Sequence, residues 1–383
     1  MPFTTLSSSA ITGGVGDSLR PNAKPLIING DMAVAQRSTS VTGHNAVSYT
    51  TVDRFKTVNE IGTYTVIQES LTSGNAFNNG FKNALRMDCT TAEASGSAGD
   101  QTTFEYRMEG FDLQAFKKGT SNAQPFTLAF WVKANKTGSN IQVNLRDNTN
   151  DRQVGGTYSI SSTDTWEHKV INFVADTTGV FADANTAELI IEWFLDGGSN
   201  YSGGSVPTSW EAKTNANRNV TNFDFGGSTD NDWAITGIQL EVGTYTSSTL
   251  PPFQFESYGE NLHRCKRYYQ GWGSIYDTGT SSISGRIISG NRFDSETIML
   301  NPEMRAAPSI SQGGTANIAN YYIQYDGNAV TTGSGSSFGT LNTQKGSTRF
   351  RVTSNASISS DHVANCQTGG ADGKQHLIFD ADL

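Results

Sequence analysis

The sequence predicts an all-β protein: a β-sandwich, then a short helix, then a second and smaller β-sandwich domain. Charged residues make up only 16% of the 383 residues, against about 25% in typical domains. Ser, Thr, Asn and Gly replace them, and apolar residues recur at every second position over many short runs. Clusters of Gly, Asn, Asp and Ser separate these runs and indicate turns. Many short strands with almost no helical period are typical of a sandwich.

The expected elements begin after residues 1–25, which have no sustained period. We expect that segment to become ordered only by docking on a partner. From Leu26 onward the chain alternates, and the run over residues 126–133 places Phe126, Leu128, Phe130 and Val132 on one face. Further alternating runs occupy residues 64–68, 104–108, 141–146, 154–160, 166–174, 188–195 and 233–242.

The Pro251-Pro252 pair closes the first domain, residues 26–252, because neither residue can donate a hydrogen bond to a strand ladder. A linker over residues 253–270 follows and contains the one expected helix, residues 257–269. Alternation then returns over residues 284–289, 296–300, 321–325, 349–352 and 376–379. These runs predict the C-terminal β domain, residues 271–383.

The charge balance and the cysteines limit the partners and the compartment. With 27 basic and 36 acidic residues the net charge is −9, so we expect no nucleic-acid partner and no attraction to anionic lipid. The apolar stretches are too short for membrane insertion. Cys89, Cys265 and Cys366 are too far apart and too few to form a disulfide framework, so free thiols are expected. Without a basic and apolar leader, we expect a soluble protein made in the cytoplasm.

Motifs that would carry catalysis or metal binding are incomplete. Residues 16–19 match the Gly-Asp-Ser-Leu block of an esterase family, but no apolar strand precedes it and no Asp-x-x-His follows. His362, Cys366 and His376 are zinc-ligand types, yet their Ser, Asn and Gly surroundings favour plain loops. Residues 147–151 alternate oxygen ligands but lack the glycine and closing Glu of a calcium loop, so we expect a hairpin tip. Nothing singles out a carboxylate pair for glycoside cleavage. We therefore expect no catalytic residue, no metal and no cofactor.

Aromatic and amide side chains provide the candidate binding site. Trp131 alternates with the apolar face of its run and should stand on the other face of the sheet. A flat ring beside neutral amides and a guanidinium suits a sugar, whose apolar face stacks while its hydroxyls form hydrogen bonds. The candidate glycan-binding residues are Trp131, Lys133, Gln142, Asn144 and Arg146. The alternative is that Trp131 packs under a loop or against a neighbouring subunit.

An apolar stripe on the expected helix predicts self-association. Its residues, with those that follow, are Leu262, Cys265, Tyr268, Tyr269 and Trp272. They are more than one helix can bury alone, so we expect intersubunit contacts here and in the C-terminal domain of a homotrimer. The alternative is that the stripe only joins the two domains of one chain.

A set of motifs resembles a known module. The motifs are Leu26-Ile-Ile-Asn-Gly-Asp-Met, Asp53-Arg-Phe, FTLAFWVKA at 126–134, Thr165-Trp166, Phe173-Val-Ala-Asp-Thr-Thr-Gly and Ile235-Thr-Gly-Ile-Gln-Leu-Glu-Val-Gly. Together they resemble the carbohydrate-binding-module-like jelly roll of tail-fibre and other virion proteins of tailed bacteriophages, notably marine ones. Residues 255–270 are similar to the linker that leaves this module. Residues 302–309 and 379–383 are similar to the small β domain after it.

The resemblance implies a virion protein, usually trimeric and often facing the receptor. The expected function is a tail fibre or receptor-binding protein that attaches the particle to host surface polysaccharide, with residues 1–25 anchored to other virion proteins. The alternatives are a capsid decoration or head-fibre protein without a ligand, a bacterial carbohydrate-binding module, and a polysaccharide-degrading spike enzyme. Related modules often place a calcium-binding Asp in the last strand. This chain has Thr236 and Gly237 there, so the resemblance implies no calcium.

Overall fold

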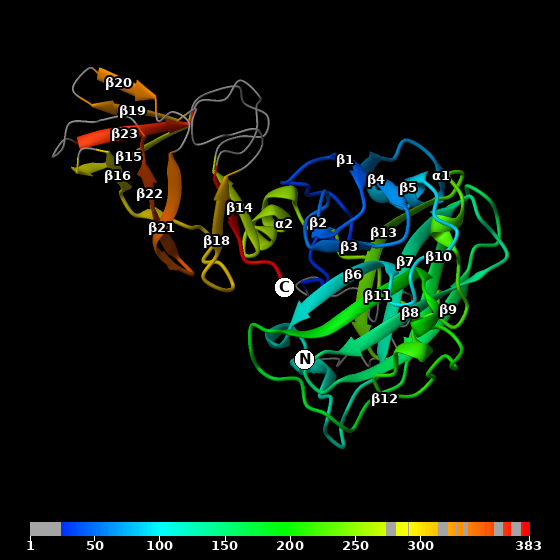
Figure 1. Ribbon diagram of the computed structural model, residues 1–383. Coiled ribbons are helices and arrows are strands. Elements are labelled where there is room, and N and C mark those ends of the chain that lie inside the picture. The colour runs from blue at the N-terminus through cyan, green and yellow to red at the C-terminus, as the bar shows by residue number, and fades with distance from the viewer. Residues whose placement is uncertain are drawn as a thin grey trace, which may run out of the picture. The chain divides into compact units, whose positions relative to one another are not determined.

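The computed structural model describes residues 24–272, 281–289, 291–312, 321–325, 328–331, 336–355, 363–368 and 377–383. They divide into two compact units, each built from antiparallel sheets, so the predicted all-β architecture is confirmed (Figure 1). Unit 1 comprises the described residues up to Ala35 together with Thr39–Asn261. Unit 2 comprises Gln36–Ser38 and the described residues from Leu262 onward. Most of the expected anchoring segment, residues 1–23, lies outside the described residues.

Unit 1 contains two sheets. Sheet A has the strand order β1-β4-β5-β13-β7-β10, and sheet B has the order β12-β9-β8-β11-β6-β3-β2. The strands of sheet A are β1 (Ser40–His44), β4 (Thr63–Ser70), β5 (Asn83–Thr91), β13 (Asp232–Val242), β7 (Phe126–Ala134) and β10 (Glu167–Phe173). The strands of sheet B are β12 (Glu211–Ala212), β9 (Arg152–Ser159), β8 (Asn140–Asp147), β11 (Ala187–Gly197), β6 (Gln101–Glu109), β3 (Phe55–Asn59) and β2 (Val47–Tyr49). The helical segments of unit 1 are α1 (Gly74–Asn78), η2 (Gly110–Asp112), η3 (Gln114–Phe116), η4 (Ser199–Tyr201), η5 (Asn215–Asn217) and η6 (Phe225–Gly227).

Aromatic rings from both sheets meet in the core of unit 1. Phe104 of sheet B lies 5.4 Å from Trp233 of sheet A, and Trp193 of sheet B lies 5.6 Å from Phe130 of sheet A, measured between ring centroids. All four side chains are fully buried, and each contributes about 1.5–3 kcal/mol or more of hydrophobic stabilisation. The predicted inward face of β7 is confirmed, because all four of its members belong to this core.

The single expected helix is shorter than predicted. Helix α2 (Tyr258–Cys265) begins one residue late and ends four residues early, and Tyr269 instead starts strand β14 (Tyr269–Trp272). The stripe spacing of Leu262 and Cys265 is helical, but Tyr269 pairs with Asp380 of a C-terminal strand. Backbone pairing with a partner distant in sequence therefore overrides the local helical period.

Unit 2 combines a small and a larger sheet. The smaller has the order β14-β24-β18, with β24 (Leu377–Asp380) and β18 (Ser309–Gln312). The larger has the order β17-β22-β16-β15-β23-β19-β20, and β21 also pairs with β22. Its strands are β17 (Ile298–Met299), β22 (Ser347–Thr353), β16 (Arg292–Ser295), β15 (Ser281–Ser289), β23 (Val363–Thr368), β19 (Tyr321–Tyr325), β20 (Asn328–Thr331) and β21 (Ser337–Gln344). Leu377 and Phe379 share one core with Phe293 and Phe350, so both sheets bury the same apolar cluster.

Candidate functional site

The structure does not bring the five predicted glycan-binding residues together. Trp131 and Lys133 lie on β7 of sheet A, whereas Gln142, Asn144 and Arg146 lie on β8 of sheet B. Both groups alternate with core residues and therefore face outward from opposite sides of the sandwich. The prediction of one shared face is wrong. Its physical reason is that the connection between these successive strands crosses from one sheet to the other.

Residues 215–220, which we call the cover segment, lie over the outer face of sheet B. The side-chain amide of Gln142 donates to the backbone carbonyl of Asn217 at 2.7 Å, and that of Asn144 donates to the carbonyl of Arg218 at 2.9 Å. Both side chains are 0% exposed. These amides bind the chain's own backbone, so they are not available to a sugar.

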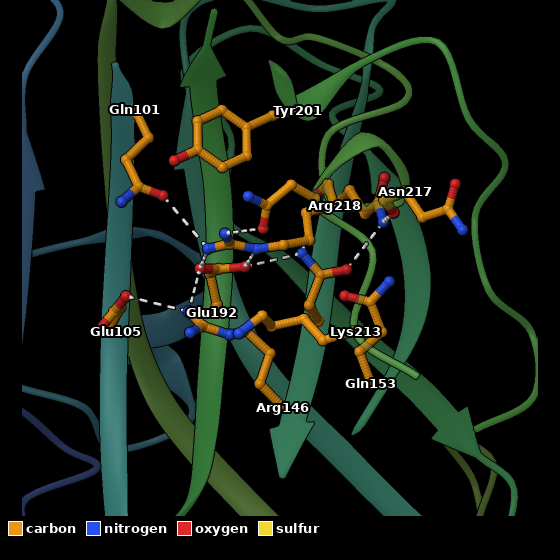
Figure 2. A network of polar contacts seen from close by, with 12 residues as sticks. Gln101, Glu105, Arg146, Gln153, Glu192, Tyr201, Lys213, Asn217 and Arg218 are labelled. Carbon is orange, nitrogen blue, oxygen red and sulfur yellow. Dashed lines mark hydrogen bonds and ion pairs between the residues drawn. The ribbon is translucent and has the colours of Figure 1, made fainter. Parts of the chain in front are cut away.

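A cluster of charges lies beneath the cover segment, with Arg146 and Arg218 approaching Glu192 from two sides (Figure 2). Arg146 donates to Glu192 at 2.8 Å, and Arg218 forms two contacts with the same carboxylate, one of them at 3.2 Å. Burial alone would raise the pKa of Glu192, but the two guanidinium groups outweigh it and lower the pKa to about 2. A carboxyl group that stays ionised at neutral pH cannot act as a general acid. Glu192 instead binds Arg218 and so holds the cover segment on sheet B.

The acidic run after β8 is the predicted hairpin tip, since β8 and β9 pair directly across it. Its first carboxylate, Asp147, accepts a hydrogen bond from Lys118 at 2.5 Å. The fully buried ammonium of Lys118 also lies 3.1 Å from Asp176 and donates to the carbonyls of Thr178 and Gly179 at 2.9 and 2.7 Å. A lysine thus supplies the positive charge for these oxygens.

The outer face of sheet A carries an open hollow of about 340 Å³, which we call the aromatic hollow. Its lining residues are Asn79, Phe81, Trp131, His168, Gly237, Gln239, Ser247, Leu250, Pro251, Pro252, Phe253 and Phe255. Strands β10, β7 and β13 supply its base, since Trp131 pairs with His168 on one side and with Thr236 on the other. Of the five predicted residues, only Trp131 lines it.

Gly237 makes room for two of the rings. It lies at an irregularity in the pairing of β13 with β7 and has a φ of +62°, a conformation that glycine adopts without strain. A Cβ atom at this position would lie 2.6 Å from Cζ of Phe81 and 3.0 Å from Cδ1 of Trp131. The missing side chain therefore allows Phe81 and Trp131 to pack on the strand.

The rings of the hollow form two groups. The Trp131 and His168 rings lie 5.0 Å apart with an interplanar angle of 32°. Phe81, Phe253 and Phe255 lie within 4.8–5.1 Å of one another. Phe255 is 51% exposed, so a ring face remains open to solvent. Aromatic surface of this kind can stack on the apolar face of a sugar.

Polar groups in the hollow retain hydrogen-bonding capacity. Gln239 uses both of its N–H groups, donating to Glu241 at 3.0 Å and to the carbonyl of Pro251 at 2.9 Å. Its Oε1 has no partner among the described residues, and neither do the His168 ring nitrogens or Nε1 of Trp131. Burial lowers the pKa of His168, so its ring is neutral near pH 7 and offers one donor and one acceptor.

Lys133, the other predicted residue of β7, lies outside the hollow. Its ammonium is 3.9 Å from the Glu69 carboxylate and 5.5 Å from the centre of the Trp166 ring. Sequence reasoning missed His168, Gln239 and Phe255, which come from three separate segments. The Pro-Pro pair followed by Phe-Gln-Phe was the available indication of an exposed aromatic wall.

A second hollow, of about 360 Å³, lies elsewhere in unit 1 and is lined by Leu113, Gln114, Lys117, Lys118, Thr120, Asn122, Val180 and Phe181. It contains one aromatic ring, Phe181, which lies 5.1 Å from the buried Lys118 ammonium. It therefore lacks the paired rings of the aromatic hollow.

The predicted oligomer-contact residues are largely buried within the chain itself. Cys265, Tyr268 and Tyr269 are 0%, 1% and 3% exposed, and Leu262 is half-buried. The Arg37 guanidinium covers the Tyr269 ring at 3.7 Å. Burial of these residues therefore does not by itself require a second subunit, and the intersubunit contact stays a prediction. The Trp272 side chain lies outside the described residues.

The other predicted motifs are the esterase-like block, the zinc-ligand residue types and the free cysteines. Residues 16–19, His362 and His376 lie outside the described residues. Cys366 is buried, which raises the pKa of its thiol to about 12, and all three cysteines are free, as predicted. Within the described ranges, no three His, Cys, Asp or Glu side chains gather as a metal site. No helix in the part of the chain that the structure describes is long and apolar enough to cross a membrane.

Comparisons with known proteins give structural likenesses only. No protein-family model matches the chain, and no curated protein matches it. The tailspike protein 4 domain of bacteriophage CBA120 matches with 13% identity and a TM-score of 0.28, over 57% of this chain and 21% of that one. The module TmCBM61, solved with β-1,4-galactotriose, matches with 8% identity and a TM-score of 0.27, over 57% and 99%.

The xylan-binding domain CBM22-1 of Xyn10C from Paenibacillus barcinonensis matches with 7% identity and a TM-score of 0.25, over 56% of this chain and 99% of that one. At these TM-scores and identities the three matches carry no weight for what this chain binds.

Proposed function

We propose that this chain is a non-enzymatic structural component of a tailed-phage virion, a tail fibre or receptor-binding protein that attaches the particle to host surface glycans. The observation that carries the proposal is the aromatic hollow, in which Trp131 and His168 lie side by side and Phe255 stays exposed. Stacking surface with unused hydrogen-bonding groups at its edge is what a sugar ring requires. The resemblance of the motif set to virion jelly rolls supports the same role.

One hollow of this size binds weakly. Stacking contributes on the order of 1 kcal/mol beyond area burial, and each hydrogen bond adds about 0.5–1.5 kcal/mol net. After the cost of association, a single site should have a dissociation constant of roughly millimolar. Attachment then depends on several copies acting together. A homotrimer anchored to other virion proteins through residues 1–25 would provide them.

The test is adsorption of the purified full chain to host surface polysaccharide. Phe255→Ala should lower adsorption, because it removes the exposed ring of the hollow. Phe111→Ala is the matched control, since Phe111 is also 51% exposed and does not line the hollow. Equal adsorption of both variants and the unaltered protein would contradict the proposal.

The position in the virion is tested separately. Labelling of purified particles should find the chain on the tail, and deletion of residues 1–25 should abolish its incorporation while leaving it folded. Light scattering should return three times the mass of one chain. Label on the capsid shell, together with no adsorption, would instead favour a head-decoration protein.

A further inference from the structure

The side chains that line the aromatic hollow restrict its ligand to one class of sugar. Resting on the function proposed above, we infer that it takes an uncharged sugar residue and that Gln239 is the residue that discriminates. The ligand places a hydroxyl donor on Oε1 of Gln239 and an apolar ring face against the aromatic lining.

The first argument is charge. The twelve residues that line the hollow are all described, and none is Lys, Arg, Asp or Glu. Glu241 accepts a hydrogen bond from the Gln239 amide at 3.0 Å. A carboxylate on the sugar would lose water and gain no cation from these lining residues. An acidic sugar is therefore disfavoured.

The second argument is that two titratable groups of the described strands β7 and β10, Lys133 and His168, do not replace the missing cation. Lys133, on the same strand as Trp131, lies at the Glu69 carboxylate and over the Trp166 ring. Burial keeps the His168 ring in its neutral form near pH 7. Neither group supplies positive charge inside the hollow.

The third argument is the fixed polarity of Gln239. Both N–H groups of its amide are held, one by Glu241 and one by the Pro251 carbonyl. The amide cannot flip without losing both bonds, so it presents only an acceptor oxygen to the hollow. A hydroxyl satisfies that oxygen, whereas an ether or a carboxylate oxygen does not.

The remaining groups favour a polyol over an apolar ligand. Nε1 of Trp131 offers a donor, and the neutral imidazole of His168 offers a donor and an acceptor. Ligand sites run from about 300 to 1,000 Å³, so a hollow of about 340 Å³ suits a single sugar ring and not a chain.

The experiment titrates the full chain with paired methyl glycosides and follows binding by ligand-observed NMR. Each neutral sugar, with gluco, galacto or manno configuration, is compared with the uronic acid of the same configuration. At least one neutral sugar should bind about tenfold more tightly than its acid. A uronic acid that binds equally well or better overturns the inference and leaves glycan binding intact. If neither class binds at millimolar concentration, the proposed function fails as well.

A pair of variants tests whether Gln239 provides the preference for neutral sugars. Gln239→Met keeps the length of the side chain and removes the acceptor, so neutral-sugar binding should fall at least about tenfold. Gln254→Met is the matched control, because Gln254 lies between two lining residues but does not line the hollow. Thermal unfolding is measured for both variants. If Gln239→Met does not fold, replacing each hydroxyl of the bound sugar in turn by a methoxy group tests the same contact on the unaltered protein. Unchanged binding throughout would overturn the role of Gln239.

Discussion

Replacement of Lys118 by Met should be among the most destabilising single changes in unit 1. The Lys118 ammonium is fully buried and binds two carboxylates, Asp147 and Asp176, and two backbone carbonyls. It also lies 4.9 Å from the centre of the Trp210 ring. Methionine fills a similar volume but removes the ammonium that these four oxygens share. Loss of stability would therefore come from electrostatics and not from a cavity.

The expected magnitude follows from the partners that remain. Removing one member of a buried ion pair typically costs about 3–5 kcal/mol. Asp176 keeps the Arg152 guanidinium at 2.7 and 3.0 Å, and Asp147 keeps the Asn150 amide at 3.0 Å. The lower end, about 3 kcal/mol, is therefore expected. For a domain of about 150–250 residues this corresponds to a fall in Tm of about 6–12 °C.

The assay is calorimetric or denaturant unfolding, with Lys117→Met as the control. Lys117 is the adjacent residue and is exposed, so its replacement should change stability by no more than about 0.5 kcal/mol. If Lys118→Met loses no more stability than Lys117→Met, the assignment of Lys118 as the internal cation is refuted.

The ion pair between Lys118 and Asp176 also predicts how the stability loss of Lys118→Met changes with pH. Burial opposes ionisation of Asp176, but the Arg152 guanidinium, the Thr178 N–H and the Lys118 ammonium outweigh it and lower its pKa. A lowered folded-state pKa stabilises the protein above the unfolded value and loses that contribution as the pH falls. The stability difference between Lys118→Met and the unaltered protein should thus narrow in acid. A difference that widens instead would contradict the ion-pair account.

Three further predictions concern the hollow and the cover segment. Gly237→Ala should lower stability by about 2–4 kcal/mol, through strain at positive φ and overlap with two rings; urea unfolding that shows no loss would contradict the described close approach. Trp131→Ala should cost about 2 kcal/mol, because the ring is half-buried, whereas Phe255→Ala should cost less than about 1 kcal/mol; thermal scans of both variants test this order. Glu192 has a lowered pKa, so its stabilisation, on the order of 3 kcal/mol, should be complete above its ordinary pKa and disappear as the pH approaches 2. Unfolding measured at pH 7 and pH 3 should show the decline, and Glu192→Gln should lack it.

Alternation in the sequence predicted which side chains face the core but not which sheet each strand joins. The inward residues of β7 and β8 are the expected ones. The period of a strand is two whichever sheet it enters, so Trp131 and Asn144 share a pattern without sharing a surface. Sheet membership depends on backbone pairing with strands far away in the sequence, which a local period does not record.

The same limit explains the helix and the hollow. Tyr269 matched a helical stripe, yet it pairs with Asp380, more than a hundred residues later. Phe255 and His168 line the same hollow as Trp131 only because three segments converge on one face. The sequence also does not show whether outward-facing neutral polar side chains are open to solvent, since their hydrogen-bond partners can be water or another segment of backbone.

Gln142 and Gln239 show how that ambiguity is resolved by hydrogen bonds and not by burial. Both are outward-facing glutamines on the same sandwich, with exposures of 0% and 7%. Gln142 donates to Asn144 and to the Asn217 carbonyl, at 2.8 and 2.7 Å, and its Oε1 accepts from the Val220 N–H at 3.0 Å. No further polar partner is needed there. Gln239 makes the two donor bonds but leaves its oxygen to solvent or to a ligand. A sugar hydroxyl that replaces solvent at the Gln239 oxygen keeps a hydrogen bond there, so little free energy is lost. A ligand group that cannot donate leaves this acceptor desolvated without a partner, which costs about 1–3 kcal/mol. The outer face of sheet A therefore keeps an acceptor oxygen for the ligand that we propose, whereas Gln142 on sheet B does not.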